Sequence, residues 1–341
     1  MSVNYRILQP HDIEVSEAYE QFALDVLIGL SMSPKSICSK YLYDETGDSL
    51  FQQIMELPEY YLTWCELEIF QEHKDRIAGL IGDGDINLVE LGAGDGKKTE
   101  VLLDHFFRKG LRFEYIPIDI SETAVHGLIC KFDHYLPNVQ IEGLVAEYFD
   151  GLKWLSSMNH KRNVVLFLGS NIGNFSQSEA RTFLHSLWNA LNHGDYLVIG
   201  FDLKKDIDLL TKAYNDSQGV TAQFNLNLLQ RINEELGGNF DLDKFQYYSS
   251  YNVFTGAIES YLVSSQRQAV YIQTLNQFFP FEAWEPLHTE YSHKYLVPDT
   301  ALLAEETGFE VVDQLFDSKQ YFVDSIWQVK KSTALALAFS S

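Results

Sequence analysis

The spacing of apolar residues changes along the chain and divides it into three parts. Up to about Gly84, apolar positions recur every three to four residues, which predicts helices over 17–31, 50–57 and 65–82. From Asp85 to Asp202, short runs rich in Val, Ile and Leu alternate with helical patterns. Runs of this kind are typical of strands buried on both faces, so this part predicts a parallel sheet covered by helices on both sides.

The alternation breaks after Asp202. Residues 205–245 have helical patterns, and three later segments alternate apolar and polar positions like antiparallel strands. The chain ends in a helix and two strand patterns, which could add two strands to the first sheet. We therefore expect an α/β fold with a parallel sheet and an inserted α+β cap domain. The expected organisation is an N-terminal helical segment over 1–84, a core over 85–204 and 296–331, and the cap over 205–295.

Composition narrows the class of partner. The 341 residues carry 48 acidic and 25 basic side chains, a formal net charge of −23. Such a chain repels phosphate backbones and anionic membranes, so we expect a small-molecule substrate, no nucleic acid and no membrane. Three scattered cysteines form no ligand or disulfide pattern, so we expect no metal. The sequence has no leader pattern or membrane span, and we expect a cytoplasmic protein; the oligomeric state is not predicted.

The run LVELGAGDGKKT lies where the first predicted strand of the sheet meets a helix. Glycines there let the backbone pass close to a ligand, although a plain tight turn would also explain them. The dinucleotide fingerprint needs a third glycine where Lys97 stands, so Gly92 and Gly94 suit S-adenosylmethionine (SAM) better than a pyrophosphate. Lys97 or Lys98 could pair with the carboxylate of that cofactor.

Two later strand ends carry further candidate residues for the cofactor. Asp119 ends the next predicted strand, where a carboxylate can accept both hydroxyls of a ribose. Ser121, two residues later, is expected to cap the helix that comes next. Glu147 and Tyr148 are expected to end the third strand beside an adenine, although an aromatic residue there could equally belong to the core.

Several separated motifs coincide with one family. The chain resembles the SAM-dependent L-histidine Nα-methyltransferases of ergothioneine biosynthesis. The segments that carry the resemblance run from about residue 41 to 295 and are YDETGDSLFQQIMELPEYY, LVELGAGDGKKT, PIDIS, FLGSNIGNF, FDLKKD, AYNDSQGVTAQFNLNLL and HTEYSHKY. The resemblance implies a Rossmann-like class I methyltransferase fold, SAM as the methyl donor, and transfer to the α-amine of histidine, giving the trimethylated betaine hercynine.

The resemblance also assigns residues, position by position. It places the cofactor at Gly92, Gly94, Lys98, Asp119, Glu147 and Tyr148. It places the amino acid at Tyr43, Tyr60, Gly169, Asn174, Tyr214, Ser260, Glu290 and Ser292. Glu290 and Ser292 match the pair that holds the imidazole, and two residues apart they can project to one side of a strand. Tyr43 is the candidate catalytic residue, through a proton-accepting water.

Two departures from the family pattern keep other interpretations open. Leu62, Thr63 and Trp64 follow EYY where the family commonly has proline, threonine and arginine, and Ser260 stands where it often has methionine. These changes favour, as alternatives, a methyltransferase of another small amine or amino acid. A non-catalytic cofactor-binding module is the remaining alternative, and it would bind SAM without turnover.

Overall fold

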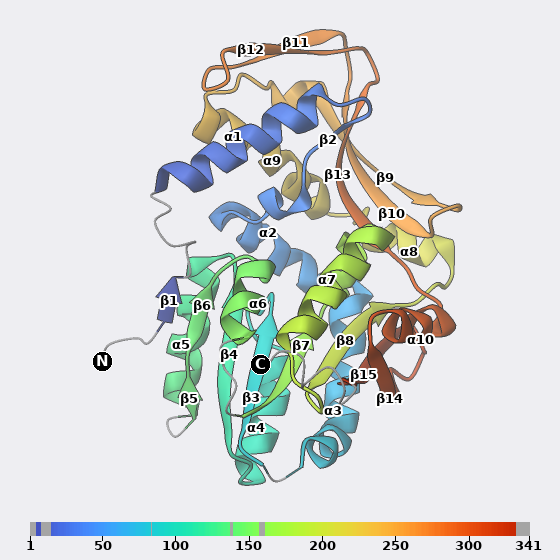
Figure 1. Ribbon diagram of the computed structural model, residues 1–341. Coiled ribbons are helices and arrows are strands. Elements are labelled where there is room, and N and C mark those ends of the chain that lie inside the picture. Colours follow the sequence, from blue (N-terminus) through green and yellow to red (C-terminus); the bar gives the residue numbers. More distant parts are fainter. Residues whose placement is uncertain (1–4, 8–14, 83, 137–138, 157–160, 332–341) are drawn as a thin grey trace. The chain divides into compact units, whose positions relative to one another are not determined.

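The computed structural model describes residues 5–7, 15–82, 84–136, 139–156 and 161–331, and the chain forms two compact units (Figure 1). Unit 1 comprises 1–10, 62–204 and 294–341, and unit 2 comprises 11–61 and 205–293. The units thus divide the expected N-terminal helical segment between them. Residues 1–4 and 8–14, which are part of the segment considered for a leader pattern, lie outside the described residues.

Unit 1 is built on a large sheet. Its described strands are β1 (Tyr5–Ile7), β3 (Ile86–Leu91), β4 (Phe113–Asp119), β5 (Gln140–Ile141), β6 (Gly143–Val145), β7 (Arg162–Phe167), β8 (Tyr196–Asp202), β14 (Phe309–Phe316) and β15 (Phe322–Val329). The order is β1-β6-β4-β3-β7-β8-β15-β14, with β5 also paired to β4. All pairs from β1 to β8 are parallel, and β15 and β14 add antiparallel strands. This confirms both the α/β fold class and the expectation that the last two strands join the first sheet.

Helices cover both faces of this sheet. They are α3 (Tyr61–Ile81), α4 (Thr99–Arg108), α5 (Glu122–Tyr135), α6 (Tyr148–Ser156), α7 (Gln177–Ala190) and α10 (Val297–Glu306), with a short 3₁₀ turn η2 (Asn171–Asn174). In Figure 1, α6 and α7 lie in front of the strands, with α3 and α4 behind them. Strand residues such as Val89 and Phe167 pack with α7 residues such as Phe183 in one apolar cluster. Burial on both faces explains why these strands read as continuous apolar runs.

The sequence of unit 1 sets where its helices begin. The Ser121 hydroxyl accepts a hydrogen bond from Ala124 N–H, so it caps α5 as expected. Ser176 and Glu179 form a reciprocal capping box at the start of α7. One expectation is wrong: β6 ends at Val145, and Tyr148 begins α6 rather than ending a strand. The carbonyl of Glu147 accepts the amides of Asp150 and Gly151, which starts the helix at that point.

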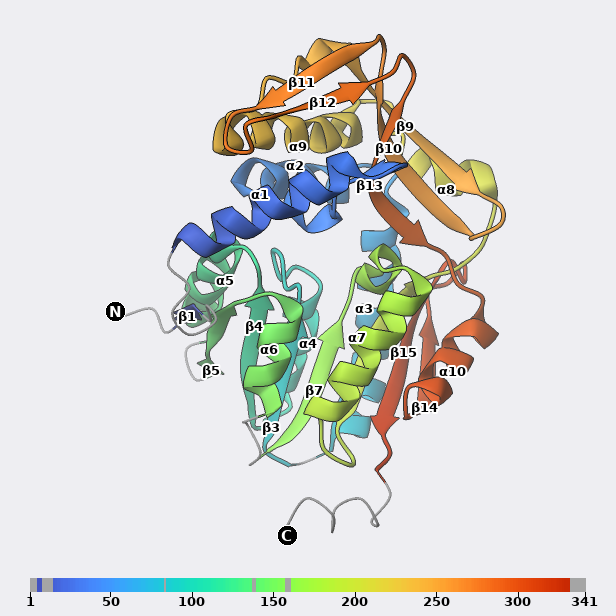
Figure 2. The same ribbon diagram turned by 45° about the horizontal axis from the view of Figure 1, so that its top comes forward.

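Unit 2 combines a four-stranded sheet with helices. Its strands are β2 (Lys35–Ser36), β9 (Phe245–Asn252), β10 (Ala257–Ser264), β11 (Gln268–Ile272), β12 (Gln277–Phe281) and β13 (Pro286–His293). Its helices are α1 (Val15–Ser31), α2 (Glu45–Glu56), α8 (Ile207–Ala213) and α9 (Val220–Leu236), with 3₁₀ turns η1 (Ser39–Leu42) and η3 (Leu242–Lys244). The sheet order is β2-β13-β10-β9, and β11 and β12 pair as a hairpin (Figure 2).

Contacts between the two segments of unit 2 explain why they belong together. β2 pairs in parallel with β13, and the Asn227 amide of α9 donates to the Asp44 carboxylate, which also caps α2. The Arg231 guanidinium donates to the Tyr41 carbonyl over 3.1 Å. Residues 11–61 therefore complete the unit that the sequence placed in 205–295 alone.

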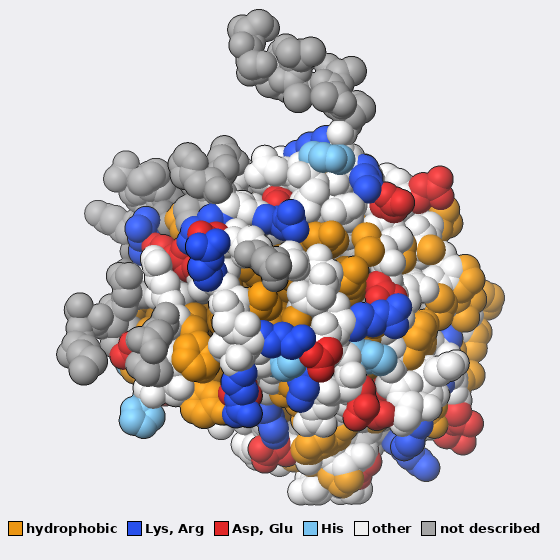
Figure 3. Space-filling view, turned by 90° about the horizontal axis from the view of Figure 1, so that it is seen from below, with side chains coloured by type: hydrophobic (Ala, Val, Ile, Leu, Met, Phe, Trp, Pro, Cys, Tyr) orange, Lys and Arg blue, Asp and Glu red, His pale blue; other side chains and the backbone are white. Residues whose placement is uncertain are grey.

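Charged side chains of both signs are mixed on the surface shown in Figure 3. Lysines and arginines lie there among acidic and apolar side chains rather than in one continuous basic area. Within the described part of the chain, no helix is long and apolar enough to cross a membrane.

Candidate functional site

The glycine loop leaves β3 at the point where the strand order reverses. β3 pairs with β4 on one side and β7 on the other, and ligands of open α/β sheets bind at the carboxyl end of such a switch point. Gly92 has φ of +72°, and its N–H donates to the Ile118 carbonyl over 2.8 Å. A Cβ at Gly92 would lie 2.8 Å from the Tyr148 hydroxyl and 2.9 Å from Asn171 Nδ2. Only glycine fits this conformation and this space.

Asp119 lies at the end of β4, directly beside the loop. One of its carboxylate oxygens accepts the Gly94 N–H at 3.0 Å, and the other accepts the Ser121 N–H at 3.0 Å. Burial raises the pKa of this carboxyl, while the backbone hydrogen bonds oppose that rise. Asp119 therefore holds the glycine loop against the start of α5 and retains acceptor capacity for a ligand hydroxyl.

A buried carboxylate lies between the two ends of the glycine loop. Glu90, two residues before Gly92, accepts hydrogen bonds from the hydroxyls of Thr99 at the start of α4 and Tyr115 on β4. Burial raises the pKa of Glu90 to about 7, although both hydrogen bonds oppose the shift. The two ends of the glycine loop are thereby joined through one side chain.

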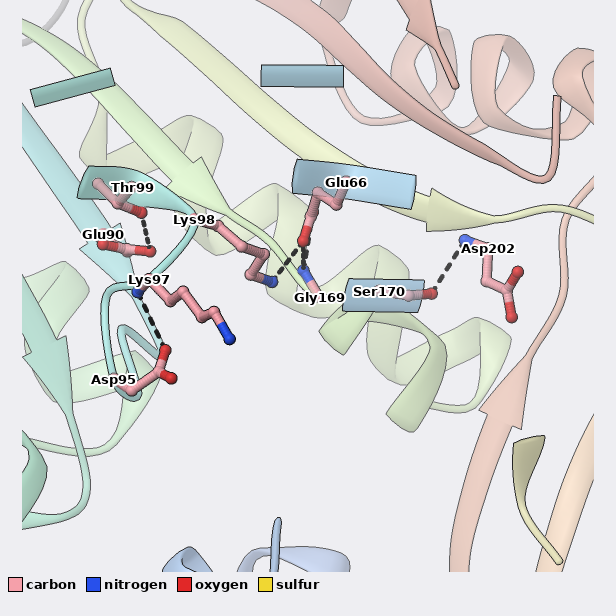
Figure 4. A network of polar contacts seen from close by, with 9 residues as sticks. All are labelled: Glu66, Glu90, Asp95, Lys97, Lys98, Thr99, Gly169, Ser170 and Asp202. Carbon is pink, nitrogen blue, oxygen red and sulfur yellow. Dashed lines mark hydrogen bonds and ion pairs between the residues drawn. The ribbon is translucent and has the colours of Figure 1, made fainter. Parts of the chain in front are cut away.

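Lys98 belongs to a network that the sequence did not indicate (Figure 4). Its ammonium group pairs with Glu66 of α3, a carboxylate with no exposed surface. Both oxygens of Glu66 also accept the Gly169 N–H at 2.9 Å. One carboxylate thus connects the glycine loop to the loop that follows β7, and each loop holds predicted binding residues.

Another buried acid lies close to this network. Asp324 of β15 is fully buried, and burial and the charge of Glu66 raise its pKa well above the usual range. The Nζ of Lys98 is 3.3 Å from the place where a Cβ of Gly169 would stand. Lys98 and Gly169 are therefore neighbours in the structure, although the sequence assigned them to different ligands.

The remaining predicted residues of unit 1 lie around the same loops. Tyr148 is half-buried beside Phe167 and Phe183, and its hydroxyl lies close to Gly92. Asn174 ends the turn η2, whose first residue, Asn171, was not among the predicted residues. The repeated asparagine in GSNIGN is the only signal in the sequence that could have suggested Asn171.

In unit 2, predicted residues meet on one face of the sheet. Ser260 of β10 is directly opposite Glu290 of β13, and Ile258 is opposite Ser292. Residues opposite one another in an antiparallel pair point to the same face, with Cβ atoms about 5 Å apart. The hydroxyl of Tyr214, at the end of α8, lies 2.7 Å from that of Ser292.

Aromatic rings continue the site in unit 2. The ring of Tyr60 lies 6.1 Å from that of Tyr214 and 6.2 Å from that of Phe51. Tyr43 contacts Phe51 and Phe224 at 5.5 and 5.4 Å between ring centres. Unit 2 therefore brings together Tyr43, Tyr60, Tyr214, Ser260, Glu290 and Ser292, whereas Gly169 and Asn174 belong to unit 1.

Trp64, one of the departures from the family pattern, is half-exposed on α3. The ammonium group of Lys97 lies 5.2 Å from the centre of its ring, which is a cation–π contact. Of the two lysines in the loop, Lys98 is therefore the one that reaches the buried network. Among the described residues, no group of three or more His, Cys, Asp or Glu side chains is arranged to hold a metal.

The chain is similar to known proteins over most of its length. The model of the SAM-dependent histidine-specific methyltransferases matches residues 22–329. The chain belongs to this family. It is 34% identical to the histidine N-alpha-methyltransferase of Mycolicibacterium smegmatis over 296 residues, 87% of this chain and 91% of that one. It is 36% identical over 271 residues to the enzyme of the same name in Mycobacterium tuberculosis, covering 80% and 83% of the two chains.

A third relative differs in length. The ergothioneine biosynthesis protein 1 of Neurospora crassa is 35% identical over 206 residues, which are 60% of this chain and 23% of that protein. The family confirms the predicted SAM-dependent N-methyltransferase and its methyl donor. The individual contacts of the binding residues with their ligands stay predictions.

Proposed function

We propose that this methyltransferase transfers a methyl group from SAM to the α-amine of histidine, and continues to the trimethylated betaine hercynine. The observation that carries this proposal is the arrangement in unit 2. Tyr214 and Ser292 are hydrogen-bonded beside Glu290, on the face that Ser260 shares. A carboxylate and hydroxyls suit an imidazole, which presents one nitrogen as donor and one as acceptor. The names of the two mycobacterial relatives support the same substrate.

The chemistry of unit 1 fits the methyl donor. Gly92 leaves open a space that a Cβ would fill, so the backbone can pass close to the cofactor. Asp119 would accept the ribose hydroxyls, and Glu147 and Tyr148 would lie at the adenine. Lys98, kept charged by Glu66, would bind the cofactor carboxylate. Gly94 would hold the loop in place through its bond to Asp119.

The chain's own contribution to the reaction is to orient the amine. SAM supplies an electrophilic methyl group on a sulfonium, so no strong base is needed to break its bond. Asn174, Gly169 and Tyr214 would hold the amino and carboxylate groups of the amino acid. The α-amine must lose its proton before its lone pair can attack the methyl group, and Tyr43 would order the water that takes the proton.

The cell compartment and the partner class are part of the proposal. The scattered cysteines and acidic composition of the sequence support a cytoplasmic enzyme that acts on a free amino acid. The strong negative charge disfavours nucleic acid and anionic lipid as substrates.

The test is turnover of labelled SAM with free histidine, with products resolved as mono-, di- and trimethylated species. Glu290→Gln should raise KM for histidine strongly and leave KM for SAM unchanged, because only the ring loses a charged partner. Glu282→Gln, an exposed glutamate of the same unit, is the matched control and should behave as the wild type. A folded wild-type protein that forms no N-methylated histidine would refute the proposal, and preference for another amino acid in a panel would replace histidine as the substrate.

A further inference from the structure

One face of the sheet in unit 2 carries the hydroxyl groups of Ser260, Ser249 and Tyr247, which we call the hydroxyl row. Of these three residues, only Ser260 was predicted from the sequence. Ser260 of β10 pairs with Glu290 on one side and with Ser249 of β9 on the other. Tyr247 is two residues from Ser249 and therefore points to the same face. The opposite face is different, since there the ring of Tyr261 packs against that of His288. The two faces of this sheet thus have separate partners.

Tyr247 makes two hydrogen bonds that both reach predicted substrate residues. Its hydroxyl donates to the backbone carbonyl of Tyr214 over 2.8 Å and lies 3.2 Å from the hydroxyl of Ser260. Burial raises the pKa of this phenol and the charge of Glu290 raises it further, so the group stays a donor at neutral pH. Tyr247 therefore contacts both Tyr214 and Ser260, two of the predicted substrate residues.

Ser249 adds a second hydroxyl to the row. It is 8% exposed, lies close to Tyr247, and its Oγ makes no hydrogen bond of normal geometry with a described residue. A buried hydroxyl without such a bond is unfavourable, so a ligand atom or a water that satisfied it would be stabilised. A ring with nitrogen atoms can supply that partner directly or through water, whereas a hydrocarbon ring cannot.

We propose that Tyr247 is a positioning residue that fixes Tyr214 and Ser260, and that this hydroxyl row makes the site selective for an amino acid with a polar ring. The inference rests on the proposed function, because it assigns the ring of the substrate to this face. An apolar ring would offer no hydrogen bond to the buried hydroxyl of Ser249, and none to Ser260 or Glu290 on the same face. Sites that hydrogen-bond their substrate reject analogues lacking the bonding group by about 10⁴-fold.

The experiment compares Tyr247→Phe with Tyr248→Phe. Both variants remove one phenol hydroxyl from β9, but Tyr248 is 59% exposed and on the other face. For Tyr247→Phe we expect KM for histidine to rise about tenfold, because the hydrogen bonds that position Tyr214 and Ser260 are lost, with kcat and KM for SAM within about twofold. The preference for histidine over phenylalanine in kcat/KM should fall by a similar factor. Tyr248→Phe should match the wild type in every constant.

The outcomes separate the two claims. A wild type that does not methylate histidine would end the proposed function, whereas normal turnover with an unchanged KM in Tyr247→Phe would overturn only this inference. Equal increases in KM for histidine and SAM would also overturn it, since they would indicate a general loss of structure. If Tyr247→Phe does not fold, Ser249→Ala tests the same row: a smaller preference for histidine over phenylalanine supports the inference, and an unchanged preference overturns it.

Discussion

The carboxyl group of Glu90 should make the protein less stable as the pH rises towards neutrality. Its pKa is about 7 in the folded chain against the ordinary 4.5. Below both values the group is protonated in either state and contributes nothing. Between them the unfolded chain loses the proton first, so the folded state is progressively destabilised, and the loss is complete above the folded pKa.

The size of this loss follows from the shift. A difference of 2.5 units corresponds to about 3 kcal/mol at full ionisation, and integration between about pH 5 and pH 8 gives about 2.5 kcal/mol. Glu90→Gln cannot ionise. The free energy of unfolding of this variant, relative to the wild type, should therefore increase by about 2.5 kcal/mol over that range.

The measurement is urea unfolding of both proteins at several pH values, followed by tyrosine and tryptophan fluorescence. Glu72→Gln, at an exposed position on α3, is the control and should follow the wild-type curve at every pH. Parallel curves for Glu90→Gln and the wild type would refute the reasoning, because they would mean that Glu90 ionises normally inside the protein.

Three further predictions concern the cofactor loop and the core of unit 1. Gly92→Ala should weaken SAM binding and lower the melting temperature more than Gly82→Ala does. Both glycines have positive φ, but only at Gly92 would the added Cβ clash with Tyr148 and Asn171. Equal effects of the two substitutions would contradict this. Lys98→Met should raise the Kd of S-adenosylhomocysteine, measured by calorimetry, by about ten- to a hundredfold, the contribution of one charged hydrogen bond, and Lys97→Met should not; the reverse result would assign the carboxylate to Lys97. Lys294→Met should lower the free energy of unfolding by about 3–5 kcal/mol, because Lys294 and Asp202 pair at 2.8 Å with no exposed surface. The double variant Lys294→Met, Asp202→Leu should recover most of this loss. If the effects of the two substitutions simply add, the two side chains are not coupled.

The sequence predicted the sheet of unit 1 because its strands are buried on both faces and so carry an unbroken apolar signal. Tyr148 was placed wrongly because an aromatic residue after a short strand looks like a strand end, whereas the backbone of Glu147 starts a helix there. β2 has only two residues, too few for any periodic signal. It owes its place to pairing with β13, which is far away in the chain.

Patterns of neighbouring residues predicted the glycine loop but not Glu66, the carboxylate that supports it. Glu66 is 32 residues from Lys98 and 103 from Gly169, and no spacing rule connects residues so far apart. The resemblance supplied the residues of unit 2 one by one, and their hydroxyl and aromatic contacts appear only when the strands pair. Tyr247 and Ser249 had no motif to single them out among the many tyrosines and serines of the chain.

The interleaving of the two units has a consequence for how the polypeptide is made. The chain passes between the units at residues 10–11, 61–62, 204–205 and 293–294, so neither unit is complete until nearly all of it has left the ribosome. Residues 11–61 emerge first, yet β2 must wait for β13 to be synthesised. Early segments of both units are then exposed together during translation, and this nascent chain should depend on chaperones more than one with sequential domains.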